Sequence, residues 1–284
     1  MTADMTGTVC LVTGATSGIG HETALGLARA GARVGIVGRD RARTDRSAQA
    51  IRADVPGAVV DAFVADLSSQ AQVRHLAAEV RSAYDRLDVL VNNAGAIFDS
   101  HAVTEDGIER TWALDHLAYM LLTLELLDLL KASAPARIVS VASMAHKRGR
   151  IGTDSATGYS AIKAYSQAKL GNVLFTAALA RRLAGSGVTA NSLHPGVVAT
   201  GFAGGTGGWF GLAWKVIRPF LIAPSDGAAT SLHLATSPDV EGVSGLYFAR
   251  CRPVPVSAAA RDEALQERVW ASSLRQIGEP GSLP

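Results

Sequence analysis

The stretch TGATSGIG, at residues 13–20, constrains the fold more than any other part of the chain. It directly follows the apolar run VCLVT and leads into the helical pattern HETALGLARAG. Gly14 permits a sharp turn, Gly18 lets the backbone approach a pyrophosphate, and Gly20 lets helix and strand pack closely. The helix N-terminus adds oriented N–H groups that attract an anion. We therefore expect a dinucleotide site here, formed by Gly14, Thr16, Ser17, Gly18, Ile19 and Gly20.

The same alternation of apolar runs and helical patterns continues along the chain. The later apolar runs are ARVGIVG, AVVDAFVADL, LDVLVNNAG, ARIVSVAS and GVTANSLHPG. Between them we expect helices that include one near 69–84 and a long apolar one near 105–131. Strands that are apolar throughout are buried on both faces, and strands separated by helices tend to run parallel. The pattern predicts an α/β fold with a doubly wound, Rossmann-type parallel sheet, whose ligand lies beyond the carboxyl ends of the strands.

The chain has 284 residues, enough for one large domain. No linker or shift in composition divides it, so we predict a single domain over 6–284. Its cofactor half spans about 6–140, and its catalytic and substrate half about 141–284, with a substrate lid near 201–224.

Charge and cysteine content exclude several classes of partner. The formal net charge is +2, and no run of Lys and Arg alternates with aromatic residues as in a nucleic-acid-binding surface.

Cys10 lies in an apolar run, where a thiol is typically buried, so we expect a reducing, cytoplasmic setting. We expect neither a signal peptide nor a membrane anchor. The segment at 209–224 is too short and too interrupted by charge to span a bilayer. We expect it to form an amphipathic helix that covers an apolar pocket, with binding to a membrane surface as the less favoured alternative.

The residue after the second strand discriminates between the two nicotinamide cofactors. An acidic residue at that point would bind the ribose 2′-hydroxyl of NAD, whereas an arginine nearby accommodates the 2′-phosphate of NADP. Here Gly38 is followed by Arg39, whose guanidinium can bind a phosphate in a bidentate manner. We therefore expect NADP(H) rather than NAD(H), although Asp40 next to it leaves NAD(H) as the alternative.

A tyrosine followed four places on by a lysine occurs twice in the stretch GYSAIKAYSQAKLGN, at 158–172. The pairs are Tyr159 with Lys163 and Tyr165 with Lys169. A phenol is a poor acid or base at neutral pH unless a cation lies near it, and this spacing places both groups on one helical face. Six residues rotate the second tyrosine by about 240° from the first around the helix, so the two tyrosines cannot share a face. Only one pair can then face the cofactor.

The motifs together resemble the classical short-chain dehydrogenase/reductase family. The resemblance rests on the Gly-x-x-x-Gly-x-Gly turn, Asp66-Leu67, NNAG at 92–95, Ser143, the Tyr/Lys helix and HPGVVAT at 194–200. Within the family, AHKRG, SQAKLGNVLF, LHPGVV and EGVSGLYF are most similar to the retinol-dehydrogenase-like subgroup. The resemblance implies further cofactor contacts from Asp66, Leu67, Asn93, Ala94, Gly95, Tyr165, Lys169, Pro195, Gly196, Val198 and Thr200.

By the family's mechanism, a tyrosine transfers a proton to or from the substrate oxygen, a serine hydroxyl binds that oxygen, and hydride moves between carbon and nicotinamide. We predict Ser143 as that serine because it ends its apolar run, whereas Ser140 lies within the run and is expected to pack. We predict Tyr165 and Lys169 as the catalytic pair. The residue before Lys169 is the small Ala168, while bulky Ile162 precedes Lys163.

One departure from the family pattern concerns the fourth catalytic residue, an asparagine that holds a water next to the lysine. The matching segment ALDHLAYMLLT has Asp115 there. A carboxylate can accept from that water, pair with Lys169 or alter the ionisation of the tyrosine. Two alternatives thus stay open, a catalytically impaired NADP-binding protein and a non-redox reaction, such as isomerisation or cyclisation, on the same scaffold.

The expected substrate is a small molecule, namely a bulky, apolar alcohol, ketone or aldehyde. Trp209, Phe210, Trp214 and Phe220 lie in the lid segment and suit an apolar ligand, although they would also suit packing against the core. We expect no metal, because His116, His146 and His194 are not spaced as ligands and are expected to have packing or backbone-bonding roles, with substrate lining as the alternative for His146. The long apolar helix fits either a homodimer or homotetramer interface or burial within one chain.

Overall fold

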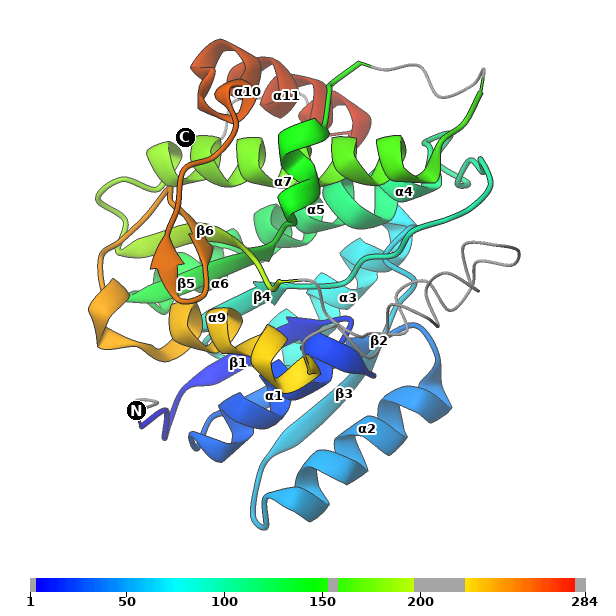
Figure 1. Cartoon of the computed structure of the whole chain (residues 1–284). Helices are drawn as coiled ribbons and strands as arrows, with labels where there is room; N and C mark the ends of the chain where they lie inside the picture. The colour runs from blue at the N-terminus through cyan, green and yellow to red at the C-terminus, as the bar shows by residue number, and fades with distance from the viewer. Residues whose placement is uncertain (1–3, 153–157, 197–222, 279–284) are drawn as a thin grey trace.

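The computed structural model describes residues 4–152, 158–196 and 223–278, and nothing below concerns the other positions. Within these ranges an eight-stranded sheet lies between two layers of helices (Figure 1). The strand order is β3-β2-β1-β4-β5-β6-β7-β8, and each neighbouring pair is parallel except the antiparallel pair of β7 with β8. The strands are β1 Val9–Thr13, β2 Arg33–Gly38, β3 Val60–Val64, β4 Val89–Asn92, β5 Ala136–Val141, β6 Val188–His194, β7 Tyr247–Ala249 and β8 Arg252–Pro253. The predicted doubly wound sheet is confirmed.

The sheet reverses its winding between β1 and β4. From β1 the chain proceeds to β2 and β3 on one side, then returns to place β4 against the other edge of β1. A crevice opens at such a reversal, beyond the carboxyl ends of the strands. The loops that follow β1 and β4 therefore meet at one place.

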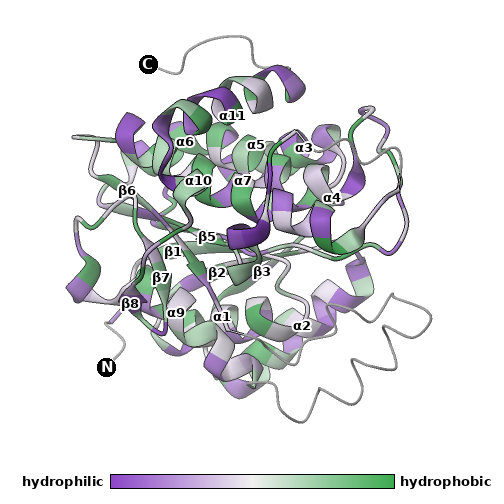
Figure 2. Ribbon diagram, turned by 45° about the horizontal axis from the view of Figure 1, so that its top comes forward, coloured by the Kyte–Doolittle hydropathy of each residue, from purple (hydrophilic) through white to green (hydrophobic). Residues whose placement is uncertain are grey.

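Helices cover both faces of the sheet, as Figure 1 shows. One face carries α1, α2 and α9, and the other carries α3, α5 and α7, with α11 packed on α7. In Figure 2, α5 is coloured as hydrophobic, whereas α11 at the top of the view alternates between hydrophilic and hydrophobic residues, as expected for an outer helix. These helices are α1 Gly18–Arg29, α2 Arg41–Asp54, α3 Gln70–Ala83, α5 Ala118–Glu125, α7 Ala161–Arg182, α9 Pro224–Thr236 and α11 Glu263–Gln276.

Polar side chains define where several of these helices begin. Asp40 accepts a hydrogen bond from the first turn of α2, Ser69 from that of α3, Ser160 from that of α7 and Asp262 from that of α11. Each side chain satisfies an N–H group that has no partner within the helix. The cap on α7 places its start at Ala161, two residues after Tyr159.

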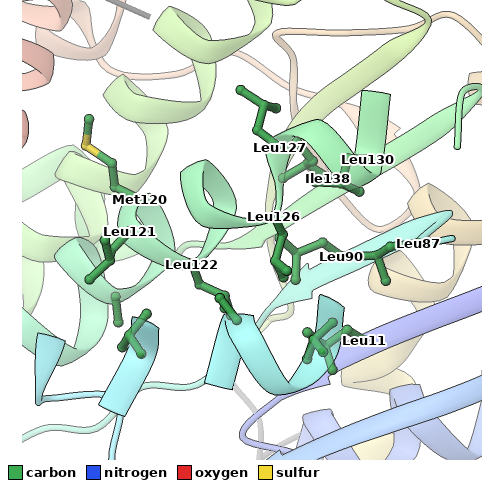
Figure 3. Close-up of a cluster of buried hydrophobic side chains, with 14 of the residues drawn as sticks. Leu11, Leu87, Leu90, Met120, Leu121, Leu122, Leu126, Leu127, Leu130 and Ile138 are labelled. Atoms are coloured by element: carbon green, nitrogen blue, oxygen red, sulfur yellow. The ribbon is translucent and has the colours of Figure 1, made fainter. Parts of the chain in front are cut away.

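The main core on the α5 side is built from leucines of the central strands and of the segment at 117–130 (Figure 3). Leu11, Leu90 and Ile138 of the sheet lie in the same cluster as Met120 and Leu122, and each is at most 1 % exposed. Burial within one chain therefore accounts for the apolar character of α5. It requires no second subunit.

The expected long helix near 105–131 differs from the observed one. The helical region begins at Arg110 and consists of α4 Arg110–Trp112, the π-helical turn η1 Ala113–Leu117, α5, and α6 Leu127–Ala132. Leu126 separates the last two with φ −101° and ψ 4°, outside the helical region. Apolar periodicity predicts the buried face of such a segment, but it does not reveal an inserted residue or a break.

The remaining described elements are short, and those after 224 had no prediction from the sequence. They are the 3₁₀ helices η2 Met144–Arg148 and η5 Pro238–Val240, together with α10 Ala258–Arg261. No helix in the described ranges is long and apolar enough to cross a membrane.

Candidate active site

A cavity of about 560 Å³ lies beyond the carboxyl ends of the central strands, and it gathers most of the residues singled out in the sequence. Its lining includes Gly14, Thr16, Ser17, Gly18, Ile19, Gly20, Arg39, Asp66, Leu67, Asn93, Ala94, Gly95, Ser143, Tyr165, Lys169, Pro195 and Gly196. Val198, Thr200 and the aromatic residues of the predicted lid lie outside the described residues. Asp115 is not among the described lining residues, but its carboxylate contacts Lys169, which lines the cavity.

The glycine-rich turn fits the diphosphate of a dinucleotide. Gly14 and Gly18 have φ values of +66° and +59°, which disfavour any residue with a Cβ. A Cβ on Gly20 would lie 2.4 Å from the Gly14 carbonyl oxygen and from Asn93 Nδ2, so the start of α1 sits directly against the turn. Ser17 precedes α1 without capping it through its side chain, which leaves the first N–H groups of the helix available to an anion.

The end of β4 is tied to the end of β1 by side chains. Asn93 Nδ2 donates to the Thr13 carbonyl at 2.8 Å, and the backbone N–H groups of Asn93 and Ala94 donate to Thr13 Oγ1 at 2.9 and 3.0 Å. These bonds close the crevice on its inner side. Asn93 thus supports the turn as well as lining the cavity.

Positive charge lines the cavity at the end of β2. Arg39 is exposed and lines the cavity, and Arg43 from the first turn of α2 lines it too. Asp40 Oδ1 accepts from the Arg43 backbone N–H at 2.8 Å, so this carboxylate caps the helix. A Cβ on Gly38 would lie 2.3 Å from Thr16 Cγ2 and Thr44 Oγ1, which explains the glycine there by close packing.

Ser143 and Tyr165 meet at the end of β5. The Ser143 hydroxyl hydrogen-bonds Tyr165, and Ser143 Oγ also accepts from the Ala145 N–H at 3.2 Å, at the start of η2. Burial, and then the nearby Asp115, raise the pKa of Tyr165, whereas the hydrogen bond from Ser143 lowers it. Tyr165 is consequently protonated at neutral pH. Ser140 is fully buried within β5, as predicted.

Lys169 lies deep beside Tyr165 on α7. Its Nζ is 5.6 Å from the centre of the Tyr165 ring, donates to the Val141 carbonyl at 3.1 Å, and lies 3.7 Å from Asp115 Oδ2. Burial lowers the pKa of Lys169, and Asp115 opposes that effect. Ala168, which precedes it, is fully buried, whereas Ile162 before Lys163 is 51 % exposed.

The second pair, Tyr159 with Lys163, is arranged differently from the expectation. Tyr159 precedes α7, so it shares no helical face with Lys163 and the argument from helical rotation does not apply to it. Its hydroxyl donates to the Phe98 carbonyl at 3.1 Å and lies 3.1 Å from Thr111 Oγ1. Tyr159 is not among the described residues that line the cavity. It packs the loop after β4 against α4.

Three histidines near the site have backbone or side-chain partners. His116 is fully buried between Asn172 Oδ1 and Ser273 Oγ, and burial lowers its pKa to about 4. His146 Nδ1 donates to the Ser143 carbonyl at 2.8 Å, and His194 Nδ1 accepts from the Gly196 N–H at 2.9 Å. In the described ranges no group of three His, Cys, Asp or Glu side chains could hold a metal ion.

Several lining residues carry no signal that the sequence analysis used. Ile97, Phe98 and Leu114 contribute apolar side chains to the cavity wall. Arg43 lies in the first turn of α2, whereas Arg39 precedes that helix, so helical spacing does not relate the two residues. Asn172 donates to the Asp115 carbonyl at 2.8 Å, a contact between distant segments that no local pattern predicts.

Comparison with known proteins gives consistent matches over nearly the whole chain. A sequence model of the family described as short chain dehydrogenase matches residues 8–208. Retinol dehydrogenase 12 of Mus musculus is 42 % identical over 275 residues, which cover 96 % of this chain and 87 % of that protein. Retinol dehydrogenase 14 of Homo sapiens is also 42 % identical, over 295 residues with the same coverage.

Solved structures agree on the fold. A crystal structure of an uncharacterized protein from Mycobacterium paratuberculosis superposes with a TM-score of 0.78 at 30 % identity and covers 99 % of this chain and 97 % of that one. A Beutenbergia cavernae structure described as an NAD(P) dependent gluconate 5-dehydrogenase, with NADP bound at low occupancy, has a TM-score of 0.70 at 29 % identity. It covers 87 % of this chain and 96 % of that one.

Proposed function

The chain belongs to the short-chain dehydrogenase family and is an oxidoreductase of its retinol-dehydrogenase-like branch, and from that premise we propose an NADP(H)-dependent reaction on bulky, lipophilic alcohols, ketones or aldehydes. The observation that carries the proposal is the convergence of Ser143, Tyr165 and Lys169 on the cavity that the glycine-rich turn lines. The residues proposed for proton transfer thus line the same cavity as those proposed for cofactor binding, which supports the proposal. The cytoplasmic location and the homo-oligomer expected from the sequence stay predictions.

The residues of the site divide the chemistry among them. When bound, the nicotinamide supplies or accepts the hydride. Tyr165 is protonated at neutral pH and can donate its proton to a carbonyl oxygen during reduction, while the Ser143 hydroxyl orients that oxygen. Lys169 contributes a buried positive charge next to the phenol ring. Alcohol oxidation would instead need the Tyr165 phenolate to accept the proton.

Arg39 and Arg43 support NADP(H) over NAD(H). Both line the cavity near the carboxyl end of β2, where a 2′-phosphate is bound in this class of fold. Asp40, which could have favoured a ribose hydroxyl, accepts from the backbone of α2. Asp40 also lines the cavity, so this loop presents two guanidinium groups and one carboxylate to it, a net positive charge.

Fluorescence titration of the purified protein with NADPH and NADH tests the cofactor assignment. We expect Arg39→Ala to weaken NADPH binding by about 10-fold or more, the value of a lost charge-assisted hydrogen bond, and to leave NADH binding nearly unchanged. Arg41→Ala is the matched control, because Arg41 is 65 % exposed, pairs with Asp45 and is not among the described lining residues. Tighter binding of NADH than NADPH by the wild-type protein would refute the assignment.

An apolar substrate is supported by Ile97, Phe98 and Leu114 in the cavity wall and by relatives named retinol dehydrogenases. NADPH consumption should be followed across lipophilic aldehydes and ketones, with short polar carbonyl compounds as controls. We expect turnover to increase with apolar bulk. Binding of NADPH without consumption of any compound would instead support an impaired enzyme, and product formation without NADPH consumption would support a non-redox reaction.

A further inference from the structure

Asp115 is a buried carboxylate whose two oxygens have different surroundings. Oδ1 accepts from the Ala96 N–H at 2.9 Å. Oδ2 has no hydrogen-bond partner among the described residues, although it is fully buried. The nearest cation is Lys169, whose Nζ lies 3.7 Å from Oδ2. The orphaned oxygen thus faces the ammonium group at a distance that suits a charge contact rather than a hydrogen bond.

The surrounding backbone fixes this carboxylate in place. Asp115 lies within the π-helical turn η1, and π-helical turns often mark functional sites. Its own carbonyl accepts from Asn172 Nδ2 at 2.8 Å, which joins the turn to α7 one helical turn beyond Lys169. A Cβ on Gly95 would lie 3.1 Å from Oδ2, so the glycine at this position leaves the carboxylate room.

Lys169 lies between this carboxylate and the phenol of Tyr165. Its Nζ donates to the Val141 carbonyl, which also accepts from the Tyr119 hydroxyl at 3.4 Å. The same Nζ is 5.2 Å from the centre of the Tyr119 ring and 5.6 Å from that of Tyr165. One ammonium group therefore interacts electrostatically with both the carboxylate and the phenol.

We propose that Asp115 is a positioning residue that holds the Lys169 ammonium by direct charge contact and weakens the field which that ammonium exerts on the Tyr165 hydroxyl. The proposal rests on the proposed function for its catalytic meaning. Tyr165, the proposed proton donor, should therefore stay protonated to higher pH in this protein than in a variant with a neutral residue at position 115.

The charged and titratable groups around the pair are consistent with this assignment. Asp115 is acted on by Lys169 of α7 and, more weakly, by Glu109 before α4, and it acts on Tyr119 of α5, Tyr159 and Tyr165. Tyr247 of β7 also interacts with Tyr165, and Lys169 acts on the adjacent His116. Burial raises the pKa of Asp115 to about 6, so the carboxylate is charged throughout the pH range in which a tyrosine ionises.

The ionisation of Tyr165 can be measured directly in the cofactor-free protein. Ultraviolet difference titration of tyrosinate, with the curve of Tyr165→Phe subtracted, isolates this residue. In the wild-type protein we expect Tyr165 to ionise above about 10, the pKa of free tyrosine. In Asp115→Asn we expect ionisation at lower pH by about one pH unit or more, because the buried negative charge that raises the Tyr165 pKa is then gone.

Two further variants make the test specific. Asp115→Ser is a second neutral variant and should shift the titration in the same direction. Glu109→Gln removes a carboxylate that is not among the groups acting on Tyr165, and its remaining side-chain oxygen can accept one of the two N–H bonds that cap α4. We expect Tyr165 to ionise as in the wild-type protein, when the curve of the matching Glu109→Gln variant with Tyr165→Phe is subtracted. Thermal melts identify any variant that does not fold. The wild-type titration remains decisive in that case, since ionisation below about 10 would overturn the proposal.

Unchanged or raised ionisation of Tyr165 in the folded neutral variants would overturn the proposal as well. This outcome is independent of the proposed function, because the titration needs neither substrate nor cofactor. Once a substrate is known, the pH dependence of kcat/KM for reduction gives a second readout. Its alkaline limb should move to lower pH in Asp115→Asn, whereas a merely structural role of Asp115 would reduce the rate without moving the limb.

Discussion

Replacing Gly20 by alanine should damage both the stability of the protein and its nucleotide site. The added Cβ would lie 2.4 Å from the Gly14 carbonyl oxygen and from Asn93 Nδ2. The carbonyl belongs to the turn itself, so it cannot rotate away as a flexible side chain can. Overpacking of this kind costs about 1 to 3 kcal/mol, and displacing Asn93 from its bond to the Thr13 carbonyl costs about 1 kcal/mol more.

The better helix propensity of alanine offsets part of this cost, by about 1 kcal/mol. We therefore expect a net loss of about 2 kcal/mol in the free energy of unfolding, and a decrease in Tm of about 5 °C. NADPH binding should be weakened at least 10-fold, because the turn is displaced where the diphosphate binds.

Gly26→Ala is the matched control in the same helix. Its Cβ would lie 2.6 Å from Leu232 Cδ1, the far end of a flexible side chain that can change rotamer at a cost of about 1 kcal/mol. That cost is close to the gain in helix propensity, so stability and NADPH affinity should stay near those of the wild-type protein. The assays are a thermal melt and a fluorescence titration. If Gly20→Ala melts and binds like Gly26→Ala, the packing explanation of this glycine is wrong.

Two further predictions concern the α11 side of the molecule. Trp270 is 3 % exposed, stacks on Phe175 with ring centres 5.7 Å apart, and lies under the Arg182 guanidinium. We expect Trp270→Ala to lower the free energy of urea unfolding by about 3 to 5 kcal/mol, whereas the exposed control Arg268→Ala should change it by less than about 0.5 kcal/mol. Equal urea midpoints for the two variants would contradict this prediction. Burial lowers the pKa of His116 to about 4, below its value near 6.5 in the unfolded chain. The unfolded chain therefore binds more protons between these two pH values, and the free energy of unfolding should fall by up to about 3 kcal/mol as the pH falls through this range. Thermal melts between pH 7 and pH 5 should therefore show a smaller loss of Tm in His116→Gln than in the wild-type protein. A larger loss in the variant would contradict a lowered pKa of His116 in the folded protein.

Local sequence patterns predicted the doubly wound fold and many of the residues that line the cavity. The strand, turn and helix at 8–29 have a spacing that few folds share, and the conformations of Gly14 and Gly18 show why glycine is needed there. Ala168 before Lys169 is buried and Ile162 before Lys163 is exposed, while the choice of Tyr165 with Lys169 as the catalytic pair stays a prediction. Such features are local, because they depend on a few neighbouring residues.

The features that the sequence did not predict depend on contacts between distant segments or on small backbone changes. The π-helical turn at Asp115 lies in a segment that is apolar almost throughout, so the sequence shows no change of period there. The role of Asp40 depended on where α2 begins, because only the start of the helix at Arg41 lets its carboxylate accept from the Arg43 N–H. The start of α7 at Ala161 removed Tyr159 from the helix and with it the premise of the rotation argument.

The most direct test of the account compares two tyrosine variants in a single-turnover measurement of hydride transfer from bound NADPH to a lipophilic aldehyde. We expect Tyr165→Phe to slow the step by at least about 100-fold, the usual contribution of a positioned proton donor, and Tyr159→Phe to retain most of the wild-type rate. Retention of the wild-type rate by Tyr165→Phe, or a greater loss in Tyr159→Phe, would contradict the assignment of Tyr165 as the proton donor.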